Sequence, residues 1–180
     1  KGSEVGAHIL SGAVMDPKAM DELIPDWKEK GCPFETPVKN DTFLVLGPEG
    51  SIPLPVFLMP PMLHNHGMYI GSLGNVARWM GQQAEALGVE IYPGFAASGL
   101  TYREDGSVKG VIAGVVGVEK NGEQGPNYSP GMELNGKYVL IGEGVRGSLA
   151  KVLIRDFKLD KDSQPQKFGI GIKELWQVPA

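Results

Sequence analysis

A stretch without a single Asp, Glu, Lys or Arg, the 28 residues from Gly50 to Ala77, constrains the fold more than any other feature of this sequence. With 21% charged residues overall, about six would be expected there. Its most apolar part, the twelve residues from Ile52 to Leu63, contains four prolines. Prolines at this density forbid a continuous helix, and the segment is too short to cross a bilayer. We therefore expect an extended apolar hairpin or loop.

Two interpretations of this segment remain open on physical grounds. It is either a proline-rich edge hairpin packed into the core, or an exposed apolar patch that meets a membrane surface or a lipophilic ligand. His64 and His66 do not decide between them. A His-x-His pair is a fragment of a possible metal site, but no neighbouring Cys or acidic residue completes it, which favours a role as polar turn residues.

Composition narrows the class of protein. The 180 residues are 42% hydrophobic and 21% charged, as in a folded domain, and the net charge of −4 argues against a dedicated nucleic-acid binder. The single cysteine, Cys32, excludes an internal disulfide framework and any Cys-only zinc or iron–sulfur site built from this chain alone. No Ser-His-Asp, Cys-His or paired-carboxylate motif stands out. The chain starts without Met or a targeting segment, so we expect an excised fragment.

Helical patterns occur twice in the first half of the chain. Asp16 and Pro17 are typical of a helix start, and Pro25 ends the run that follows. The clearest helix is expected at residues 72–87, and its apolar face is predicted to comprise Leu73, Val76, Ala77, Met80, Ala84 and Leu87. After Gly88, residues 89–92 are expected to form a strand. A helix, a glycine and a short β-branched strand are typical of an α/β unit that returns to a parallel sheet.

Strand patterns occupy most of the remainder. A short strand at residues 43–46 is closed by a Gly-Pro-Glu-Gly turn at residues 47–50. Further strands are expected at residues 95–102, 107–118 and 132–141, and a last helix at residues 149–157. Asp105 and Gly106 predict a hairpin turn between the first two of these strands.

Two Gly-rich turns are candidates for contact with a cofactor. Gly142, Gly144 and Gly147 have G-x-G-x-x-G spacing between an apolar strand and a helix, where backbone N–H groups can approach a phosphate or a ribose. Glu143 is suited to accept from a ribose hydroxyl or to be solvated. The same glycines suit an ordinary strand-to-helix turn, so both interpretations remain open. The second turn, residues 6–12, either lets the backbone approach a flat ligand or is an ordinary Gly-flanked loop.

Several sequence blocks together resemble the electron transfer flavoprotein–ubiquinone oxidoreductase family over essentially all 180 residues. They are GAHILSGA at 6–13, PDWKEKG at 25–31, NHG at 65–67, WMGQQAEALGVE at 79–90 and GIGIKELW at 169–176. More broadly, the layout resembles FAD-dependent geranylgeranyl reductases and aromatic hydroxylases. The resemblance implies a mixed α/β (α+β) fold, an incomplete FAD-binding Rossmann-like domain of that type. Residues 1–50 and 70–180 would form it with a β-sheet excursion, and residues 51–69 would be an inserted β-rich apolar hairpin.

The resemblance also implies a function. The full-length protein would contain FAD and a [4Fe–4S] cluster, take electrons from reduced electron transfer flavoprotein and pass them to ubiquinone. It would lie on one face of a membrane, either the cytoplasmic face of a bacterial inner membrane or the matrix face of the mitochondrial one. Electron transfer would be outer-sphere, so no catalytic nucleophile or base is expected. The partners would be electron transfer flavoprotein, ubiquinone and the membrane surface, with no nucleic acid.

Carried over residue by residue, the resemblance assigns contacts to three segments. Gly6, His8, Ser11 and Gly12 would lie along the flavin. Glu143, Gly144 and Gly147 would stand beside the ribose and pyrophosphate. The apolar segment would contact the membrane and admit quinone, which favours the exposed interpretation of it. Its expected contact residues are Ile52, Leu54, Val56, Phe57, Leu58, Met59, Met62 and Leu63. No metal ligand is expected in this chain.

Parts of the expected cofactor sites fall outside the sequence. The strand and G-x-G-x-x-G turn for the FAD pyrophosphate, and the acidic ribose-binding residue, would precede Lys1. The cluster cysteines and quinone-contacting glycines would follow Ala180. We therefore expect that the chain alone neither binds FAD tightly nor turns over. Two other functions remain open, an FAD-dependent reductase or hydroxylase of a lipophilic, isoprenoid-like substrate and a non-catalytic membrane-surface binding module.

Overall fold

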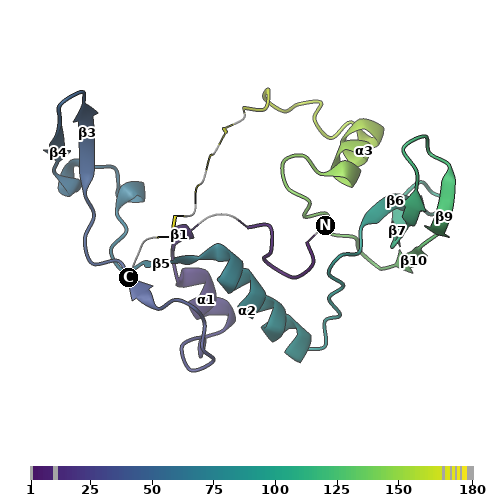
Figure 1. Ribbon diagram of the computed structural model, residues 1–180, viewed down its shortest axis with the longest axis horizontal. Helices are drawn as coiled ribbons and strands as arrows, with labels where there is room; N and C mark the ends of the chain where they lie inside the picture. The colour runs from purple at the N-terminus through teal and green to yellow at the C-terminus, as the bar shows by residue number, and fades with distance from the viewer. Residues whose placement is uncertain are drawn as a thin grey trace. The chain divides into compact units, whose positions relative to one another are not determined.

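The computed structural model describes residues 2–9, 12–167, 169–170, 172, 174 and 176–177 (Figure 1). The described residues divide into two compact units, those within 2–93 together with 174 and 176–177, and those within 94–172. Ser11, one of the residues expected along the flavin, lies outside the described residues.

The first unit is built on a small antiparallel sheet. Its strands have the order β1–β5–β2, with bounds Gly12–Met15, Tyr69–Ser72 and Thr36–Pro37. The helix α1 (Lys18–Leu23) follows β1. It begins one residue later than the sequence predicts, but the Asp16 carboxylate still accepts a 2.9 Å hydrogen bond from the Lys18 N–H, as expected of a residue at a helix start.

The long helix α2 (Leu73–Ala86) begins directly after β5 and ends before Gly88, which has φ +89°. Its extent is as predicted, but its buried face is partly different. Val76 and Trp79 are buried, whereas Met80 is 41% exposed and Leu87 is 86% exposed. The bulky indole of Trp79 turns that side of the helix toward the core, because burying the largest apolar side chain removes the most surface from water.

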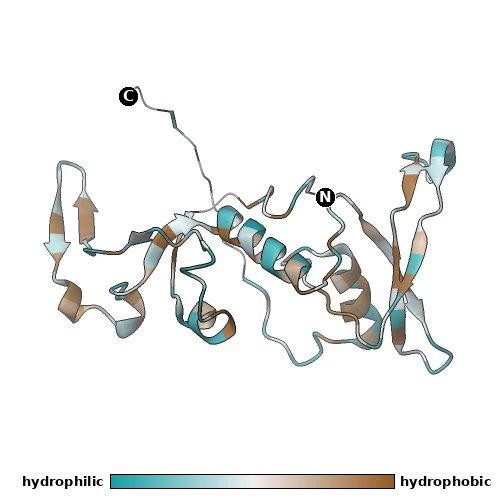
Figure 2. Cartoon of the chain, turned by 90° about the horizontal axis from the view of Figure 1, so that it is seen from below, coloured by the Kyte–Doolittle hydropathy of each residue, from teal (hydrophilic) through white to brown (hydrophobic). Residues whose placement is uncertain are grey.

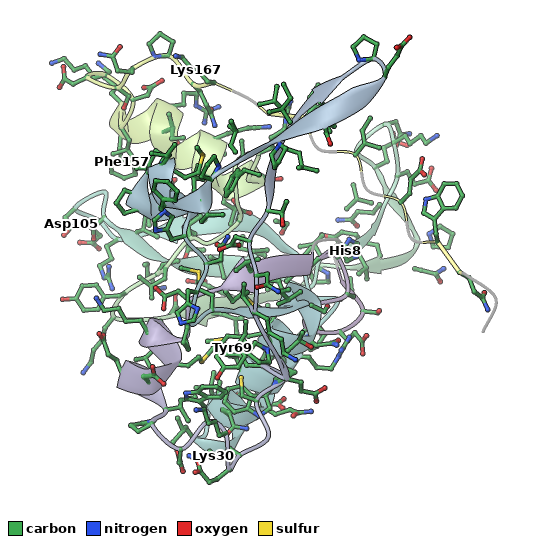
Figure 3. The ribbon with its side chains drawn as sticks, turned by 90° about the vertical axis from the view of Figure 1, so that its left-hand side faces the viewer. His8, Lys30, Tyr69, Asp105, Phe157 and Lys167 are labelled. Carbon is green, nitrogen blue, oxygen red and sulfur yellow. The ribbon has the colours of Figure 1, made fainter. Side chains whose placement is uncertain are left out.

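An aromatic cluster forms the core. It lies between α1, α2 and the loop that follows α1. Buried members are Met20, Trp27, Cys32, Phe34, Val76 and Trp79. Tyr69, labelled in Figure 3, stacks on Phe34 with ring centroids 5.4 Å apart, and Trp27 meets Phe34 edge-on. Both buried indoles find acceptors, since Trp27 Nε1 donates to Asp21 (2.7 Å) and Trp79 Nε1 donates to the Lys30 carbonyl (3.0 Å). The core is therefore aromatic and fully hydrogen-bonded at its indole groups.

A hairpin is present, but residues 43–54 form it, whereas the sequence analysis expects one at residues 51–69. Strands β3 (Phe43–Gly47) and β4 (Gly50–Leu54) pair antiparallel through the predicted turn. Two short 3-10 helices follow, η1 (Val56–Leu58) and η2 (Pro61–Leu63). Figure 1 shows the hairpin standing away from α1 and α2. After β4 the chain forms single turns and not a paired strand, because proline has no backbone N–H to donate to a neighbouring strand.

The second unit consists of two antiparallel sheets and a helix. The first sheet has the order β10–β7–β6 and the second pairs β8 with β9. Their bounds are Ala97–Tyr102 (β6), Val108–Ala113 (β7), Val116–Val118 (β8), Gln124–Ser129 (β9) and Met132–Asn135 (β10). The helix α3 (Ser148–Phe157) follows. The Asp105–Gly106 turn between β6 and β7 is confirmed, with Gly106 at φ +81°.

Three expected strands in the chain differ from the structure. The strand expected at residues 107–118 is divided at Gly114, whose φ of +77° breaks an extended backbone. The strand expected at residues 132–141 ends at Asn135. Residues 89–92 lie outside any strand, and every strand pair among the described residues is antiparallel. An apolar segment becomes a strand only where a neighbour pairs with its backbone groups, and no described strand runs beside residues 89–91.

Candidate functional site

The Gly6 turn is packed against the beginning of α2. Gly6 has φ +82°, and a Cβ atom there would collide with the carbonyl group of Gly74. In return, a Cβ on Gly74 would lie 3.1 Å from the Gly6 oxygen and 3.6 Å from the Ile9 oxygen. The two glycines therefore allow the loop and the helix to meet backbone to backbone.

Further contacts fix the loop along the same side of α2. Glu4 forms an ion pair with Arg78, with 3.0 Å between Oε1 and Nη2. A Cβ on Gly81 would lie 3.4 Å from a Val5 methyl carbon. Gly74, Arg78 and Gly81 recur at intervals of four and three residues, which places them on one helix face. The loop before β1 is thus positioned by α2.

The structure brings two of the residues expected along the flavin to the β5–α2 junction. Gly6 contacts Gly74, and Gly12 pairs with Ser72 in the sheet register. His8, labelled in Figure 3, is exposed. The positive φ of Gly6 allows its close contact with Gly74 within the chain. Its role beside a flavin remains a prediction.

The second Gly-rich turn places a carboxylate at the start of α3. Glu143 Oε2 accepts a 2.8 Å hydrogen bond from the Ala150 N–H, in the first turn of that helix. A Cβ on Gly147 would lie 2.5 Å from the Glu143 Cβ, so glycine is needed there for the carboxylate to reach the helix. The structure therefore brings Glu143, Gly144 and Gly147 together as one capped turn.

This arrangement determines which ligand chemistry the turn suits. The N-terminus of α3 carries a partial positive charge, which attracts anions. The Glu143 carboxylate already lies at that position. A phosphate at the same point would be repelled, whereas the carboxylate has lone pairs to accept further hydrogen bonds from hydroxyl groups. A Cβ on Gly142 or Gly144 would meet no atom within 4 Å. The open backbone beside a fixed carboxylate suits a polyol or ribose.

The apolar hairpin exposes hydrophobic side chains on both of its faces. Cross-strand pairs Phe43–Leu54 and Val45–Ile52 alternate with pairs that contain Leu44 and Leu46 on the other face. The most exposed of its large apolar residues are Leu46 (76%), Ile52 (67%), Phe57 (80%), Leu58 (65%) and Met62 (83%). Figure 2 shows hydrophobic colour on β3 and on the 3-10 turn after β4. Of the eight residues expected to contact membrane or quinone, only Val56 and Met59 are half-buried.

Polar residues gather at the base of this hairpin. The Asp41 carboxylate accepts hydrogen bonds from the Asn65 backbone N–H (3.0 Å) and from Asn65 Nδ2 (2.9 Å). These two bonds lower the pKa of Asp41, the side-chain bond most. The neighbouring His64 Nε2 lies 3.0 Å from the Val56 carbonyl and 3.1 Å from the Met59 carbonyl. His64 thus serves the turn, which agrees with the interpretation as a polar turn residue.

Metal-ligating side chains do not cluster within the described part of the chain. No group of three or more His, Cys, Asp or Glu side chains within it converges on a possible ion site. Cys32 is buried in the aromatic cluster, and burial raises the pKa of its thiol. No helix among the described residues has the length and apolarity needed to span a bilayer.

Sequence reasoning missed three contributors to these sites. Residues 43–46 were expected to be a strand outside the apolar hairpin, although an unbroken apolar run without period-2 alternation already indicates that neither face is polar. The close approach of Gly74 to Gly6 left no signal, because it depends on how distant backbone segments are placed. The sequence indicated a polar turn role for His64 but not the two carbonyl groups that it meets.

Curated relatives are similar to nearly the whole chain. A probable electron transfer flavoprotein-ubiquinone oxidoreductase of Acinetobacter baylyi is 54% identical over 179 residues, which are 99% of this chain and 31% of that protein. The mitochondrial protein of that name from Dictyostelium discoideum is 54% identical over 178 residues, 99% of this chain and 29% of its own length. The Pseudomonas aeruginosa protein is 53% identical over 180 residues, with 99% and 33% covered.

No family model matches the sequence. The chain spans about a third of the length of the curated relatives it matches, between 29% and 33% for these three. The resemblance first seen in short sequence blocks is nevertheless confirmed over 99% of the chain. Over 99% of its residues this chain is therefore homologous to a segment, about a third of the full length, of proteins named electron transfer flavoprotein-ubiquinone oxidoreductase.

Proposed function

We propose that these residues are part of an oxidoreductase that contains FAD and a [4Fe–4S] cluster and passes electrons from reduced electron transfer flavoprotein to ubiquinone at a membrane surface. The observation that carries the proposal is the 54% identity over 99% of the chain with relatives named for this reaction. The exposed apolar hairpin supports it independently, since a lipophilic acceptor has to be met at an apolar surface.

The residues present fit one part of an FAD molecule. Glu143 offers a fixed carboxylate to ribose hydroxyls, and Gly142 and Gly144 leave the adjacent backbone open. Bound FAD would supply one- and two-electron redox chemistry. The role of this turn is to hold and orient a hydroxyl-bearing part of the cofactor. The pyrophosphate requires other residues, because a carboxylate occupies the N-terminus of α3.

The residues do not fit a [4Fe–4S] cluster. Such clusters are held by Cys thiolates, usually four, and the chain has one cysteine, Cys32, which is buried in an aromatic core. The cluster in this proposal is therefore held by residues other than these 180.

The apolar hairpin is proposed to enter the membrane surface and to bring ubiquinone to the protein. A monomer in water gains nothing from a two-stranded hairpin that exposes Leu46, Phe57 and Met62. Moving a side chain of that size from water into an apolar phase is favourable by about 2 kcal/mol. A few such residues give substantial interfacial binding without a spanning helix. Residues 50–77 carry no charged side chain, so inserting the turns after β4 avoids the main cost, which is burial of a charge.

The visible absorption spectrum of the full-length, detergent-extracted protein, recorded before and after reduction, tests the redox part. We expect a flavin band over a broad iron–sulfur background, both bleached by reduction. Flavin without the broad background would contradict the cluster and favour a flavin-dependent reductase of lipophilic substrates. Absence of any chromophore would leave only a membrane-binding module.

Liposome flotation tests the membrane part. Phe57→Asp and Leu58→Lys place charges in the exposed turn after β4 and should each reduce flotation of the full-length protein strongly. Leu87→Lys, at an 86% exposed position near the end of α2, is the matched control and should float like the parent. Equal flotation of all four proteins would show that the hairpin does not bind the membrane.

A further inference from the structure

The apolar tip, defined as η1 and η2, follows β4 at the open end of the β3–β4 hairpin, and few backbone hydrogen bonds hold it. In η1, Leu58 N–H donates to the Pro55 carbonyl at 3.1 Å and Met59 N–H to the Val56 carbonyl at 2.9 Å. The turn η2 has two bonds of the same kind, donated by the N–H groups of Leu63 and His64. Single 3-10 turns are weak, because their hydrogen-bond geometry is poor and side chains eclipse. The segment that carries Phe57 and Met62 needs additional support to keep one shape.

His64 supplies a link between the two turns. It follows η2 directly, and its Nε2 lies within 3.0 Å of the Val56 carbonyl and 3.1 Å of the Met59 carbonyl, at the two ends of η1. Carbonyl oxygens only accept hydrogen bonds, so Nε2 must carry the proton and donate to both. One imidazole N–H therefore ties η1 to the end of η2.

The next residue anchors the same segment to the base of the hairpin. Asn65 donates both its backbone N–H and its Nδ2 to the carboxylate of Asp41, which precedes β3. Hydrogen bonds to a charged acceptor are stronger than neutral ones. Asp41 and Asn65 are 24 positions apart in the sequence, so this pair closes the loop that contains the whole hairpin. Adjacent residues thus bind two segments, His64 the turn η1 and Asn65 the residue Asp41 before β3.

We propose that His64, anchored through Asn65 to Asp41, is a positioning residue that holds the apolar tip in the shape in which it engages membrane lipid and ubiquinone. This inference rests on the function proposed above for the hairpin and names the polar groups that prepare it. An ordered tip presents Phe57, Leu58 and Met62 without first losing conformational freedom, and such preorganisation increases affinity without adding a contact.

Steady-state kinetics of the full-length enzyme with a short-chain ubiquinone analogue test this role. His64→Leu removes the donor and keeps an apolar body of similar bulk, and we expect the KM for the quinone to rise about 3- to 10-fold with kcat unchanged. His64→Gln retains an N–H donor and should restore most of the parent KM. His66→Leu, which removes the exposed imidazole two positions away, is the control and should leave KM at the parent value.

A second measurement reports on the tip directly. Amide hydrogen exchange of Met59 and Leu63 should be faster in His64→Leu than in the parent or in His64→Gln, because their N–H groups belong to the two turns that the ring connects. Liposome flotation of His64→Leu should weaken in parallel with the increase in KM. A parent-like KM and parent-like exchange in His64→Leu would overturn the proposal, as would an equal effect of His66→Leu.

Phe57→Asp separates failure of this inference from failure of the proposed function. If Phe57→Asp abolishes flotation and raises KM while His64→Leu changes neither, the hairpin engages the membrane and His64 does not position it. If Phe57→Asp also leaves both unchanged, the hairpin has no membrane or quinone role, and the positioning role falls with it.

Discussion

The carboxylate of Glu143 lies 2.8 Å from the backbone nitrogen of Ala150 and accepts its hydrogen bond, so a side chain from the preceding turn closes the N-terminus of α3. In G-x-G-x-x-G turns that bind phosphate, the corresponding N–H groups point at the ligand. Here the protein supplies its own anion. The spacing left a phosphate or ribose contact and an ordinary strand-to-helix turn open, and of the two ligands the carboxylate favours the ribose.

Replacing Glu143 should weaken α3. Glu143→Ala removes the acceptor for the Ala150 N–H, and loss of a helix cap costs about 1 kcal/mol. Urea unfolding followed by far-UV circular dichroism measures the loss. Glu119→Ala, in the exposed β8–β9 region, is the control and should change stability by less than about 0.5 kcal/mol. Equal stability of both variants would contradict the capping role.

Gly6→Ala should destabilise the first unit. The substitution puts a Cβ at φ +82° and into the carbonyl of Gly74, so conformational strain and a backbone clash add together. Strain of this kind costs on the order of 1–3 kcal/mol. Gly50→Ala is the matched control, because a Cβ there meets nothing within 4 Å. Thermal unfolding compares the two, and a Gly6→Ala protein as stable as Gly50→Ala would show that the loop does not pack on α2 as described.

Local sequence signals predicted the helices more accurately than their buried faces. The limits of α2 follow from Ser72, which begins it, and Gly88, which ends it, and both act within a few residues. Its buried face depends on Trp79, whose indole N–H donates a hydrogen bond to the Lys30 carbonyl, 49 positions away. The expected strand at residues 89–92 failed for a similar reason, since an apolar sequence cannot show whether a partner strand is present.

The apolar hairpin was predictable because its chemistry is continuous along the chain. Prolines and the absence of charge define it without knowledge of any distant contact. Its anchoring was not predictable. Asp41 and Asn65 are ordinary turn residues in the sequence, and only the antiparallel return of β4 beside β3 brings their neighbourhoods together. The exposed residues of the candidate site could thus be read from the sequence, whereas the polar residues that position them could not.

Trp79→Phe should cost more stability than the same change at Trp176. Trp79 is 7% exposed and donates to the Lys30 carbonyl at 3.0 Å, so phenylalanine leaves a gap and removes a part-buried hydrogen bond. Loss of such a hydrogen bond costs about 1 kcal/mol, and the gap adds to the loss. Trp176 is 78% exposed, and its replacement by phenylalanine should stay within about 0.5 kcal/mol of the parent. Chemical denaturation measures both, and equal losses would contradict the assignment of Trp79 to the core.

The Asp41 carboxylate should make the first unit sensitive to acid. Its hydrogen bonds from Asn65 lower its pKa in the folded protein below the usual 3.8. The unfolded chain therefore binds a proton at a higher pH than the folded one. The contribution to stability is complete above the unfolded pKa, near 4, and is lost as the pH falls through the lower folded pKa. Urea midpoints between pH 6 and pH 2 should decrease less steeply for Asp41→Asn than for the parent below pH 4. Glu35→Gln, which replaces an exposed carboxylate of the same unit, should follow the parent. Parallel curves for Asp41→Asn and the parent would show that the Asp41–Asn65 pair does not contribute to folding.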